Sequence, residues 1–382
     1  VRVGVAVDTT AVTVSAQTEF DILAGDRVLA TSPAGEAWTV RSATDGRLEA
    51  TSATGASIAP QDGPLRVVPR MVGTVLISGR AYRGQTLLLS RGGGRVTAVN
   101  VVDLEAYLLG VVPREIGRRP PNEIEAVKAQ AVAARTYAVG NMGGREQLGF
   151  DFYATIMDQV YGGVADEDSV VTRAVSETRG EIITYDGRPI LAYYSSTCGG
   201  QTAAIEDSWP WRAPLPYLKS VPDVAPGTDR AYCSTSSRFR WTATWTRDQL
   251  LAVLGQTLRT FASSAGQRVR AVQDVEAVAT NESGRTTVRL VADDQVYNLR
   301  ADSVRWVLRP QPGPAILNSS KLYEVRTTDD TGQVTGLEIT GGGWGHGIGM
   351  CQVGAMGRAR AGQTYHQILT AYYTGTEIRR LY

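Results

Sequence analysis

The sequence predicts an α+β protein in which a β-rich N-terminal module precedes a core of mixed helices and strands. Three observations support this fold class. Residues 1–100 alternate apolar and polar positions between short turn clusters, residues 103–139 change to a helical period, and strand and helix patterns then alternate to the last residue. We therefore predict two domains, residues 1–100 and residues 101–382, the second with an inserted α+β subregion at residues 239–317.

The N-terminal module is predicted to consist of short strands. Val3, Val5 and Val7 alternate with smaller residues, and turn clusters such as residues 32–35 and 61–64 follow at short intervals. The module contains neither histidine nor cysteine, and its acidic residues are scattered. We therefore expect it to carry no catalytic group.

The helical region begins at Asp103, whose side chain is a good N-cap for the helix that follows. Leu104 and Leu108 lie at helical spacing, and the pattern continues through Val112. Pro113 has no N–H to donate, so we expect the helix to end or kink there.

A second helix is predicted after the turn at residues 120–122 and extends to about Val139. Its aliphatic and small residues recur at steps of three and four and so share one face: Ile124, Val127, Ala131, Ala134 and Ala138. Glu115 therefore falls on the short connection between the two helices.

Further elements are predicted in the second half of the chain. We expect strands at residues 180–185 and 190–194 and a helix near residues 247–261. A helix at residues 351–361 comes later, and residues 364–367 carry a capping-box pattern that opens a last helix.

Glycine occupies every second position from Gly343 to Gly349. In an extended chain these glycines would leave one face as bare backbone, with Trp344, His346 and Ile348 on the other. Bare backbone permits the close approach of another chain or of a ligand.

Composition limits the classes of function. The net charge of +1 over 382 residues argues against tight binding of nucleic acid through its phosphates. No apolar run reaches the roughly 18 residues that a membrane-spanning helix needs. The first residue is Val rather than Met, from which we expect that a leader was removed. The expected location is extracytoplasmic: secreted, periplasmic, or anchored to a membrane by a segment outside this sequence.

Glu115 is the candidate catalytic acid. A carboxyl partly buried at a helix junction can hold its proton near neutral pH, as a general acid for glycosidic cleavage must. The neighbouring Arg114, Arg118 and Arg119 would instead favour the ionised form. The alternative interpretation is an exposed acid at a helix N-terminus, stabilised by the macrodipole.

Several polar and aromatic residues are candidates for binding sugar. Gln130 and Arg135 lie off the apolar stripe of the second helix and could face the same cleft as Glu115, although they could equally be ordinary surface residues. Trp209, Trp211 and Trp344 lie in loops and could stack on sugar faces, whereas tryptophans are more often part of a core.

The three cysteines allow several interpretations. Cys198 and Cys233 are separated by a loop rich in Pro, Gly and Asp and could form a disulfide in an oxidising compartment; unrelated buried thiols are the alternative. These two residues with Cys351 and His346 could in number hold zinc, but no Cys-x-x-Cys pair is present. A cysteine nucleophile with His346 as base would make a peptidase, although no recognised signature surrounds either cysteine.

Six sequence motifs occur in order between about residue 101 and the end of the chain. They are Leu104-Glu-Ala-Tyr-Leu-Leu-Gly-Val-Val-Pro-Arg-Glu115, Glu125-Ala-Val-Lys-Ala-Gln-Ala-Val-Ala-Ala-Arg-Thr-Tyr137, Asp158-Gln-Val-Tyr-Gly-Gly163, Tyr193-Tyr-Ser-Ser-Thr-Cys-Gly-Gly200, Glu206-Asp-Ser-Trp209 and Gly343-Trp-Gly-His-Gly-Ile-Gly-Met-Cys-Gln-Val-Gly-Ala355. Together they resemble the SpoIID/LytB family, the stage II sporulation protein D and amidase-enhancer group. The first hundred residues match that family only loosely.

The resemblance implies a peptidoglycan lytic transglycosylase, a lyase acting on glycan strands stripped of their peptides. Such an enzyme cleaves the bond between N-acetylmuramic acid and N-acetylglucosamine and leaves 1,6-anhydro ends. The family's essential glutamate corresponds to Glu115, which would protonate the glycosidic oxygen and then accept a proton from the C6 hydroxyl. Because that hydroxyl is the nucleophile, the second carboxyl of a glycoside hydrolase is not needed.

The resemblance also implies that Gln159, Tyr194, Ser196 and His346 line the cleft. Some members hold zinc near the Gln-Val-Tyr motif through Cys and His ligands, but residues 156–161 contain neither, so no metal or other cofactor is expected. The expected partners are peptidoglycan strands, a cell-wall amidase and a membrane-anchored protein, with no nucleic acid. The main alternative is a non-enzymatic, glycan-binding activator of the amidase.

Overall fold

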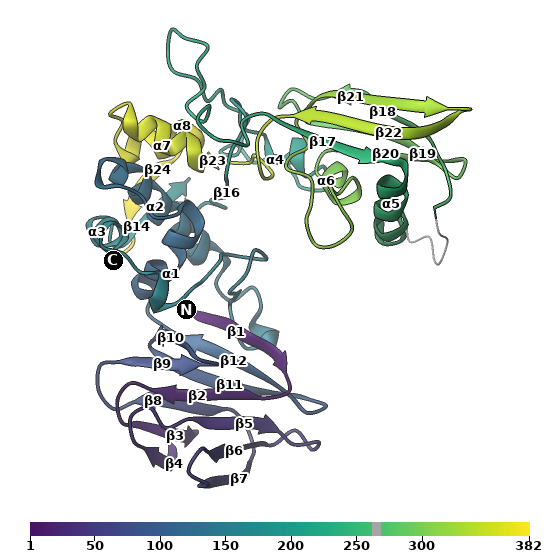
Figure 1. Cartoon of the computed structure of the whole chain (residues 1–382). Coiled ribbons are helices and arrows are strands. Elements are labelled where there is room, and N and C mark those ends of the chain that lie inside the picture. The colour runs from purple at the N-terminus through teal and green to yellow at the C-terminus, as the bar shows by residue number, and fades with distance from the viewer. Residues whose placement is uncertain (262–268) are drawn as a thin grey trace. The chain divides into compact units, whose positions relative to one another are not determined.

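The computed structural model describes residues 1–261 and 269–382, which form two compact units (Figure 1). One unit comprises Val1–Ile182 and Arg379–Tyr382, and the other comprises Ile183–Ile378. The predicted α+β class with a β-rich N-terminal part is confirmed. The N-terminal strands belong to one unit with the helices that follow them, and a separate domain at residues 1–100 stays a prediction. In the described part of the chain, no helix is both long and apolar enough to cross a membrane.

Two sheets form the N-terminal part of the first unit. Their strands are β1 (Arg2–Thr9), β2 (Val12–Ala16), β3 (Phe20–Ala24), β4 (Arg27–Ser32), β5 (Trp38–Ser42), β6 (Leu48–Ser52), β7 (Ser57–Gln61), β8 (Leu65–Pro69), β9 (Thr74–Ile77), β10 (Arg80–Arg83), β11 (Gln85–Gly92), β12 (Arg95–Val101) and β13 (Phe152–Tyr153). One sheet has the order β13-β1-β12-β11-β8-β3-β4, and the other has the order β10-β9-β2-β5-β6-β7.

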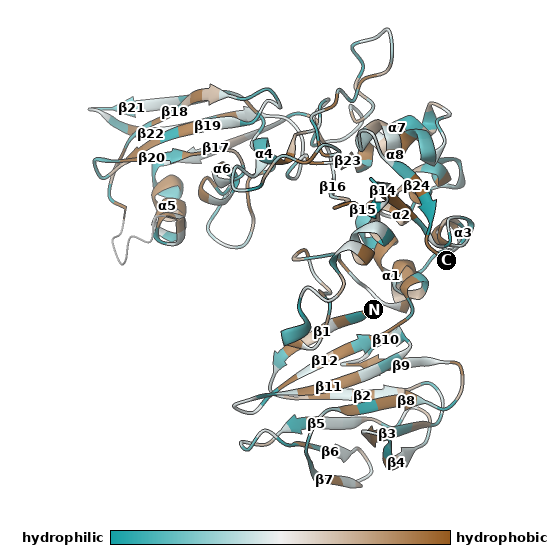
Figure 2. Cartoon of the chain, turned by 180° about the vertical axis from the view of Figure 1, so that it is seen from behind, coloured by the Kyte–Doolittle hydropathy of each residue, from teal (hydrophilic) through white to brown (hydrophobic). Residues whose placement is uncertain are grey.

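The two sheets contact each other through β11 and β12 on one side and β2 and β5 on the other. Alternate side chains of these strands therefore point into a shared core, in which Val14, Val40, Leu88 and Ala98 are buried. Figure 2 shows brown, hydrophobic stretches among paler ones along these strands. The apolar residues that alternate along these strands thus do so because they face the core between the two sheets.

Three α-helices complete the first unit and pack on one another. They are α1 (Leu104–Ile116), α2 (Ile124–Asn141) and α3 (Ser169–Glu177), and the 3-10 turns are η1 (Pro121–Glu123), η2 (Glu146–Leu148) and η3 (Val164–Asp166). Asp103 caps α1 as predicted, since its side chain accepts hydrogen bonds from the backbone N–H groups of Glu105 and Ala106. The apolar stripe of α2 is also confirmed, because Val127, Ala131 and Ala134 are buried.

The helix α1 does not end at Pro113, which was one of the two predicted outcomes, but continues to Ile116. Pro113 removes the hydrogen bond to the carbonyl of Leu109, but its ring is buried, and the packing of this turn outweighs that loss. The helix is followed by Gly117, whose φ of 75° turns the chain away. Glu115 therefore lies in the last turn of α1 rather than on a connection.

Gly110 of α1 allows the segment at residues 158–163 to pack directly against the helix. A Cβ atom at Gly110 would lie 2.6 Å from Cε2 of Tyr161, and the N–H of Gly162 donates to the carbonyl of Gly110 at 3.0 Å. The Tyr161 hydroxyl donates to Oδ1 of Asn100 in β12 at 2.9 Å. This segment thus joins α1 to the sheet.

The second unit contains most of the remaining elements, and the division between the units falls within β14 and β24. In order they are β14 (Glu181–Tyr185), β15 (Arg188–Pro189), β16 (Tyr194–Ser195), α4 (Ile205–Ser208), β17 (Trp241–Thr246), α5 (Arg247–Phe261), β18 (Val272–Thr280), β19 (Thr286–Ala292), β20 (Gln295–Leu299), α6 (Ser303–Val307), β21 (Leu322–Asp330), β22 (Gln333–Gly341), β23 (Met350–Cys351), α7 (Gln352–Arg360), α8 (Tyr365–Tyr372) and β24 (Glu377–Arg380).

Two three-stranded sheets and α5 form an α+β region within this unit. Their orders are β17-β22-β21 and β18-β19-β20, and a shared core contains Trp245, Leu254, Leu290 and Ile339. The helix predicted at residues 247–261 is confirmed as α5. Strands β21 and β22 also belong to this α+β region. The region therefore extends beyond the subregion predicted at residues 239–317.

The predicted strand at residues 190–194 is largely absent. The N–H of Tyr193 donates to the carbonyl of Leu191 at 2.8 Å, which is a tight turn rather than a ladder. Only β16 is extended, and it pairs in parallel with β23 through Tyr194 opposite Met350 and Ser195 opposite Cys351. The two motifs at residues 193–200 and 343–355 therefore lie side by side.

The glycine-rich segment is a loop rather than the predicted extended chain. Gly343, Gly345, Gly347 and Gly349 all have positive φ, between 69° and 112°, a region that other residues rarely adopt. The predicted close approach of another segment is confirmed: a Cβ at Gly349 would lie 2.1 Å from the carbonyl oxygen of Tyr193. The last two helices, α7 and α8, follow this loop, and the capping box of α8 is present.

Replacing Gly110 with alanine is expected to destabilise the first unit by about 1–3 kcal/mol, because the new methyl group overlaps the Tyr161 ring. The midpoint of urea denaturation measures the change. Gly255 in α5 is the matched control, since a Cβ there meets nothing within 4 Å, so Gly255→Ala should stabilise its helix slightly. Equal stability of Gly110→Ala and the unmodified protein would contradict the packing described.

Candidate active site

Glu115 is half-buried, and one of its oxygens is held by the backbone. Its Oε1 accepts a hydrogen bond from the N–H of Val160 at 2.8 Å. Val160 belongs to the segment that packs on Gly110, so the close helix contact sets the position of this donor. The interpretation of Glu115 as an acid at a helix N-terminus is wrong, because it lies at the C-terminal end of α1, where the macrodipole is negative.

Two of the three arginines near Glu115, Arg114 and Arg119, pair with other carboxylates. Nε of Arg114 lies 2.6 Å from Oδ2 of Asp166, and Nη1 of Arg119 lies 3.7 Å from Oε2 of Glu123. A guanidinium next to a carboxylate has part of its field compensated by that partner. These two cations therefore act on Glu115 less strongly than their sequence positions suggest.

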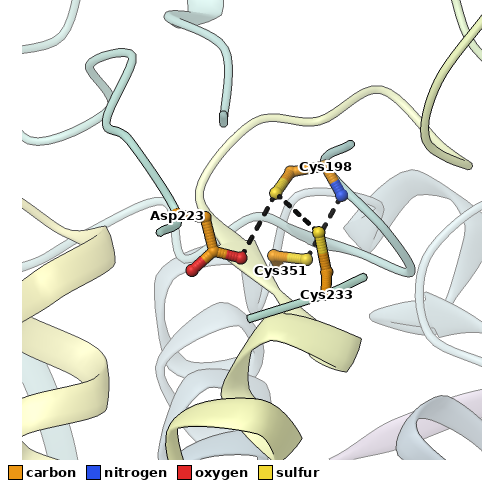
Figure 3. Close-up of side chains that lie close together, drawn as sticks. All are labelled: Cys198, Asp223, Cys233 and Cys351. Carbon is orange, nitrogen blue, oxygen red and sulfur yellow. Dashed lines mark hydrogen bonds between the residues drawn. The ribbon is translucent and has the colours of Figure 1, made fainter. Parts of the chain in front are cut away.

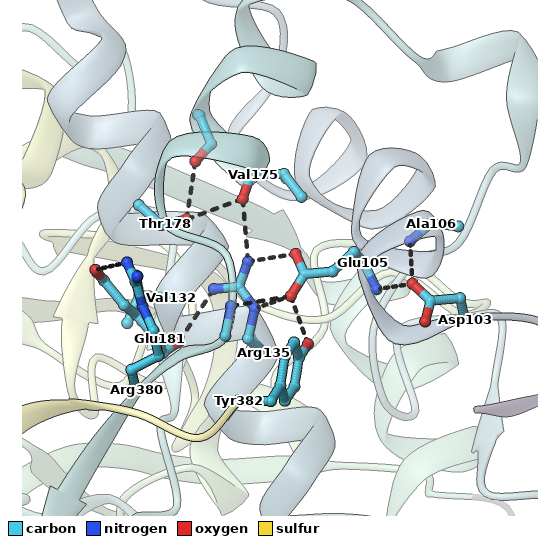
Figure 4. Close-up of polar contacts among 12 residues, drawn as sticks. Asp103, Glu105, Ala106, Val132, Arg135, Val175, Thr178, Glu181, Arg380 and Tyr382 are labelled. Carbon is cyan, nitrogen blue, oxygen red and sulfur yellow. Dashed lines mark hydrogen bonds and ion pairs between the residues drawn. The ribbon is translucent and has the colours of Figure 1, made fainter.

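Arg135 does not face a cleft, as the sequence had suggested, but is completely buried between helices (Figure 4). Its Nε and Nη2 donate to the two carboxylate oxygens of Glu105 at 2.8 and 2.7 Å, and its Nη1 donates to the carbonyl of Glu181 at 3.1 Å. This bidentate pair joins α2 to the first turn of α1. A buried cation needs such a partner, so Arg135 supports the fold rather than touching a ligand.

Glu105 receives two further donors. The hydroxyl of Tyr382 and the N–H of Gly180 donate to its Oε1 at 2.6 and 3.2 Å. Burial raises the pKa of Glu105, but the hydrogen bonds from Arg135 and Tyr382 outweigh it, so the pKa lies below the ordinary value of 4.5. Glu105 was not among the site residues predicted from the sequence, although it lies two residues after the N-cap Asp103 and hence in the first turn of α1.

Gln130 and Gln159 are buried as well. Gln130 lies on the packed side of α2 and is not exposed, which contradicts its predicted place on a cleft. Gln159 accepts a hydrogen bond from the Tyr107 hydroxyl at 3.2 Å and donates to the carbonyl of Ala134 at 3.3 Å. Gln159 therefore joins α1 to α2 and positions the neighbouring Val160, which contacts Glu115.

Tyr194, Ser196 and His346 belong to the second unit, and all three are half-buried. Tyr194 lies in β16, and the backbone of residues 196–198 continues alongside the glycine-rich loop, since Thr197 and Trp344 exchange two backbone hydrogen bonds at 3.1 and 2.7 Å. The structure thus places these motif residues on two adjacent loops. Glu115, Gln130, Arg135 and Gln159 all belong to the first unit.

His346 has a defined hydrogen-bonding role. Its Nδ1 accepts from the N–H of Ile348 at 3.0 Å, so in the neutral ring the proton lies on Nε2. Its ring packs on Trp209 and Tyr193, with centroids 5.0 and 6.1 Å away. Burial lowers its pKa to about 4, so the ring is uncharged at neutral pH.

Exposed tryptophans surround this part of the second unit. Trp211 and Trp344 are 60% and 47% exposed, whereas Trp209 is half-buried and its Nε1 donates to Asp302 at 3.1 Å. Trp211 lies beside Trp306, with ring centroids 5.7 Å apart. Of the predicted stacking residues, Trp211 and Trp344 are thus exposed, and the guanidinium of Arg238 lies over the Trp344 ring, 5.4 Å from its centroid. Trp209 instead packs against His346.

The expected disulfide between Cys198 and Cys233 is not formed: both are free thiols with their sulfur atoms 3.6 Å apart. A disulfide needs about 2.05 Å. Instead, the two sulfurs cluster with Cys351 and with Asp223, which the sequence analysis missed (Figure 3). His346 is not a member of this group, so the alternative interpretation of a zinc site that includes His346 does not match the cluster.

The Cys/His pairing that a peptidase would need is not formed in the described residues. Cys198, Cys233 and Cys351 are buried, and their sulfur contacts are with one another, with Asp223 and with the backbone. In the same described residues, the imidazole of His346 hydrogen-bonds to the backbone of Ile348 and Tyr194 rather than to a cysteine. A buried thiol without a base offers no accessible nucleophile.

Comparisons with known proteins agree with the motifs. A family described as stage II sporulation protein matches residues 92–185, and a domain of unknown function matches residues 228–349. Stage II sporulation protein D of Bacillus subtilis (strain 168) is 31% identical over 299 residues, which are 74% of this chain and 76% of that protein. The chain therefore belongs to the stage II sporulation protein D family.

Two further relatives have similar identities. An uncharacterized protein of Brachyspira hyodysenteriae is 31% identical over 303 residues, 79% of this chain and 73% of that protein. The amidase enhancer of Bacillus subtilis (strain 168) is 31% identical over 299 residues. That match covers 71% of this chain but 40% of the amidase enhancer.

Replacing Arg135 with alanine is expected to destabilise the protein by about 3–5 kcal/mol, because Glu105 would be left buried without its cation. Arg114→Ala is the matched control: it breaks a more exposed pair with Asp166 and should cost less than about 1 kcal/mol. Urea denaturation measures both. Similar costs for the two variants would contradict the structural role of Arg135.

The same ion pair predicts a pH dependence. Since the folded pKa of Glu105 is lowered, its contribution to stability is present above the ordinary value of 4.5 and is lost as the pH falls through the folded pKa. The stability difference between the unmodified protein and Glu105→Gln should therefore shrink below about pH 4.5. A difference that is constant from pH 7 to pH 3 would contradict the shift.

Proposed function

We propose that this chain is an extracytoplasmic lytic transglycosylase that cleaves peptidoglycan glycan strands, with Glu115 as its only acid–base group. The observation that carries the proposal is the half-buried Glu115 carboxyl at the end of α1, held by the N–H of Val160 within two family motifs. The names of the relatives, stage II sporulation protein D and amidase enhancer, favour a role in the cell wall.

The proposed reaction needs one carboxyl and consumes no water. Protonated Glu115 donates to the oxygen between N-acetylmuramic acid and N-acetylglucosamine, and the C1–O bond breaks. The resulting carboxylate accepts the proton of the muramoyl C6 hydroxyl as that oxygen bonds to C1. The products are a 1,6-anhydro end and a free hydroxyl on the leaving sugar, and Glu115 regains its proton.

The hydrogen bond from Val160 supports this cycle by holding one carboxyl oxygen. Oε1 accepts from the backbone N–H of Val160, which restricts rotation of the carboxyl group that would exchange the proton. A fixed carboxyl needs less reorganisation as the bond breaks than a freely rotating one. The ion pair of Arg135 and Glu105 acts indirectly, by fixing the helix that carries Glu115.

The exposed aromatic residues of the second unit are proposed to form a glycan-binding surface of that unit. Trp211 and Trp344 are exposed aromatic residues on which the apolar faces of pyranose rings could stack. We propose that His346, which is uncharged at neutral pH, lines this surface with its ring, since its imidazole hydrogen-bonds to the backbone of Ile348 and Tyr194. Tyr194 and Ser196 lie on the adjacent loop and are proposed to contribute in the same way.

The second candidate function is a glycan-binding activator of a cell-wall amidase. The similarity to the amidase enhancer favours it, and the aromatic residues would serve glycan binding in either case. An amidase is also the partner expected for the enzyme, because it would produce strands free of peptides. A membrane-anchored protein remains a proposed partner of both.

Replacing Glu115 with glutamine should abolish the formation of anhydromuramoyl products from amidase-treated glycan strands, with a loss of at least about a hundredfold. Mass spectrometry of the soluble products measures it. Glu146→Gln is the matched control, because Glu146 is an exposed acid of the same unit in η2. The enzyme proposal fails if the unmodified protein yields no such product while it binds strands and stimulates an amidase.

Alanine at Trp344 or Trp211 should weaken the binding of glycan strands by about tenfold each, the loss expected for one aromatic stacking contact. Pull-down with insoluble, peptide-free glycan measures it. Phe261→Ala is the control, since Phe261 is also an exposed aromatic residue of the second unit but lies in α5. Equal binding by all three variants would show that the tryptophans do not contact glycan.

A further inference from the structure

We propose that Cys198, Cys233, Cys351 and Asp223 bind one zinc ion that fixes the loops of the second unit. This inference is independent of the proposed activity and departs from the expectation that the chain uses no metal. The four side chains come from separate segments: the loop after β16, two positions between α4 and β17, and β23. Their ligand atoms all lie within 4.8 Å of one another (Figure 3).

The spacing of the ligand atoms suits a tetrahedral ion. Zinc binds sulfur at about 2.3 Å and carboxylate oxygen at about 2.0–2.2 Å, so tetrahedral ligands lie about 3.5–3.8 Å apart. The sulfurs of Cys198 and Cys233 are 3.6 Å apart, and the sulfur of Cys198 is 3.4 Å from Oδ2 of Asp223. Three thiolates and one carboxylate are also ligands that zinc accepts.

The surroundings of the carboxylate orient it towards the sulfurs. Oδ1 of Asp223 accepts from the Tyr372 hydroxyl at 2.8 Å and from Nε of Arg358 at 3.1 Å, and this leaves Oδ2 to face Cys198. Carboxylates that bind metals are held in this way by outer hydrogen bonds. Gly354 makes room for the arrangement, because a Cβ there would lie 2.2 Å from Oδ2 of Asp223.

Backbone donors point at the sulfur of Cys351. The N–H groups of Cys198 and Gly354 donate to this sulfur at 3.2 and 3.3 Å. Cys351 is the N-cap of α7, where the positive end of the helix dipole favours a thiolate. The donors that stabilise a charged sulfur are therefore present before any metal binds.

Charge and burial indicate a closed site. All four ligands are at most 1% exposed, which is the situation of a structural rather than a catalytic zinc. Three thiolates and a carboxylate around a divalent ion leave two negative charges. Two buried cations lie next to them: Arg358 pairs with Asp223, and Nζ of Lys321 donates to the carbonyl of Gly199 at 3.4 Å. The two cations offset part of the desolvation cost of a buried anionic centre.

The site would fix the two motif loops to each other. Cys198 follows β16 and Cys351 lies in β23, the two strands that pair in parallel. A zinc ion bound to both cysteines would restrain the loops that carry Ser196 and His346. The metal would thus stabilise the fold without contacting substrate.

The test measures zinc and thiols on the full chain. Protein purified under reducing conditions, loaded with zinc and dialysed against metal-free buffer, should retain one zinc ion per chain by mass spectrometry of the element. Cobalt loaded in place of zinc should give thiolate-to-cobalt charge-transfer absorption and the visible bands of a tetrahedral site. Retention of no metal by a protein with three titratable thiols would overturn the proposal, as would a disulfide with one remaining thiol.

Conservative substitutions test which residues bind zinc while leaving the protein folded. Tyr372→Phe removes only the hydrogen bond to Asp223 and should weaken zinc binding about 10- to 100-fold, measured by competition with a chelator. Asp223→Asn should weaken it further, whereas His346→Ala should retain full affinity. Loss of zinc in His346→Ala with unchanged binding in Asp223→Asn would show that the ligand set is wrong.

Discussion

The buried ion pair between Arg135 and Glu105 is the interaction on which the first unit depends. It joins α2 to the first turn of α1, and Glu105 also accepts a hydrogen bond from Tyr382 at the end of the chain (Figure 4). A guanidinium without solvent must have its donors satisfied, so the geometry of both helices is constrained by this one side chain. Because Glu115 lies at the other end of α1, the position of the proposed catalytic carboxyl follows from a contact three turns away.

Much of this arrangement could be predicted from the sequence, because it rests on local patterns. Alternation identified the N-terminal strands, the period of the alanines identified the packed face of α2, and Asp103 and the capping box at Thr364 marked helix starts. Local rules failed where tertiary packing outweighed them. Burial of Pro113 kept α1 intact to Ile116, which moved Glu115 from a connection into a helix.

Properties that depend on distant segments could not be predicted. Arginine is usually found on the protein surface. Arg135 can be buried because Glu105 lies close enough in space to pair with it. Asp223 joins three cysteines that lie far apart in the chain, so no spacing could have indicated the cluster. The alternating glycines predicted a close approach correctly, but their positive φ angles reflect a loop shape that alternation alone does not encode.

The central claim is that Glu115 acts alone, with the substrate's own hydroxyl as nucleophile, and one measurement tests this most directly. Peptide-free glycan strands are digested in water enriched in oxygen-18, and the new muramoyl ends are analysed by mass spectrometry. If Glu115 acts alone, the products are 1,6-anhydro ends that contain no oxygen-18, and Glu115→Gln forms none of these ends. Reducing muramoyl ends that carry oxygen-18 would contradict it, because they would show that water, rather than the C6 hydroxyl, attacks C1.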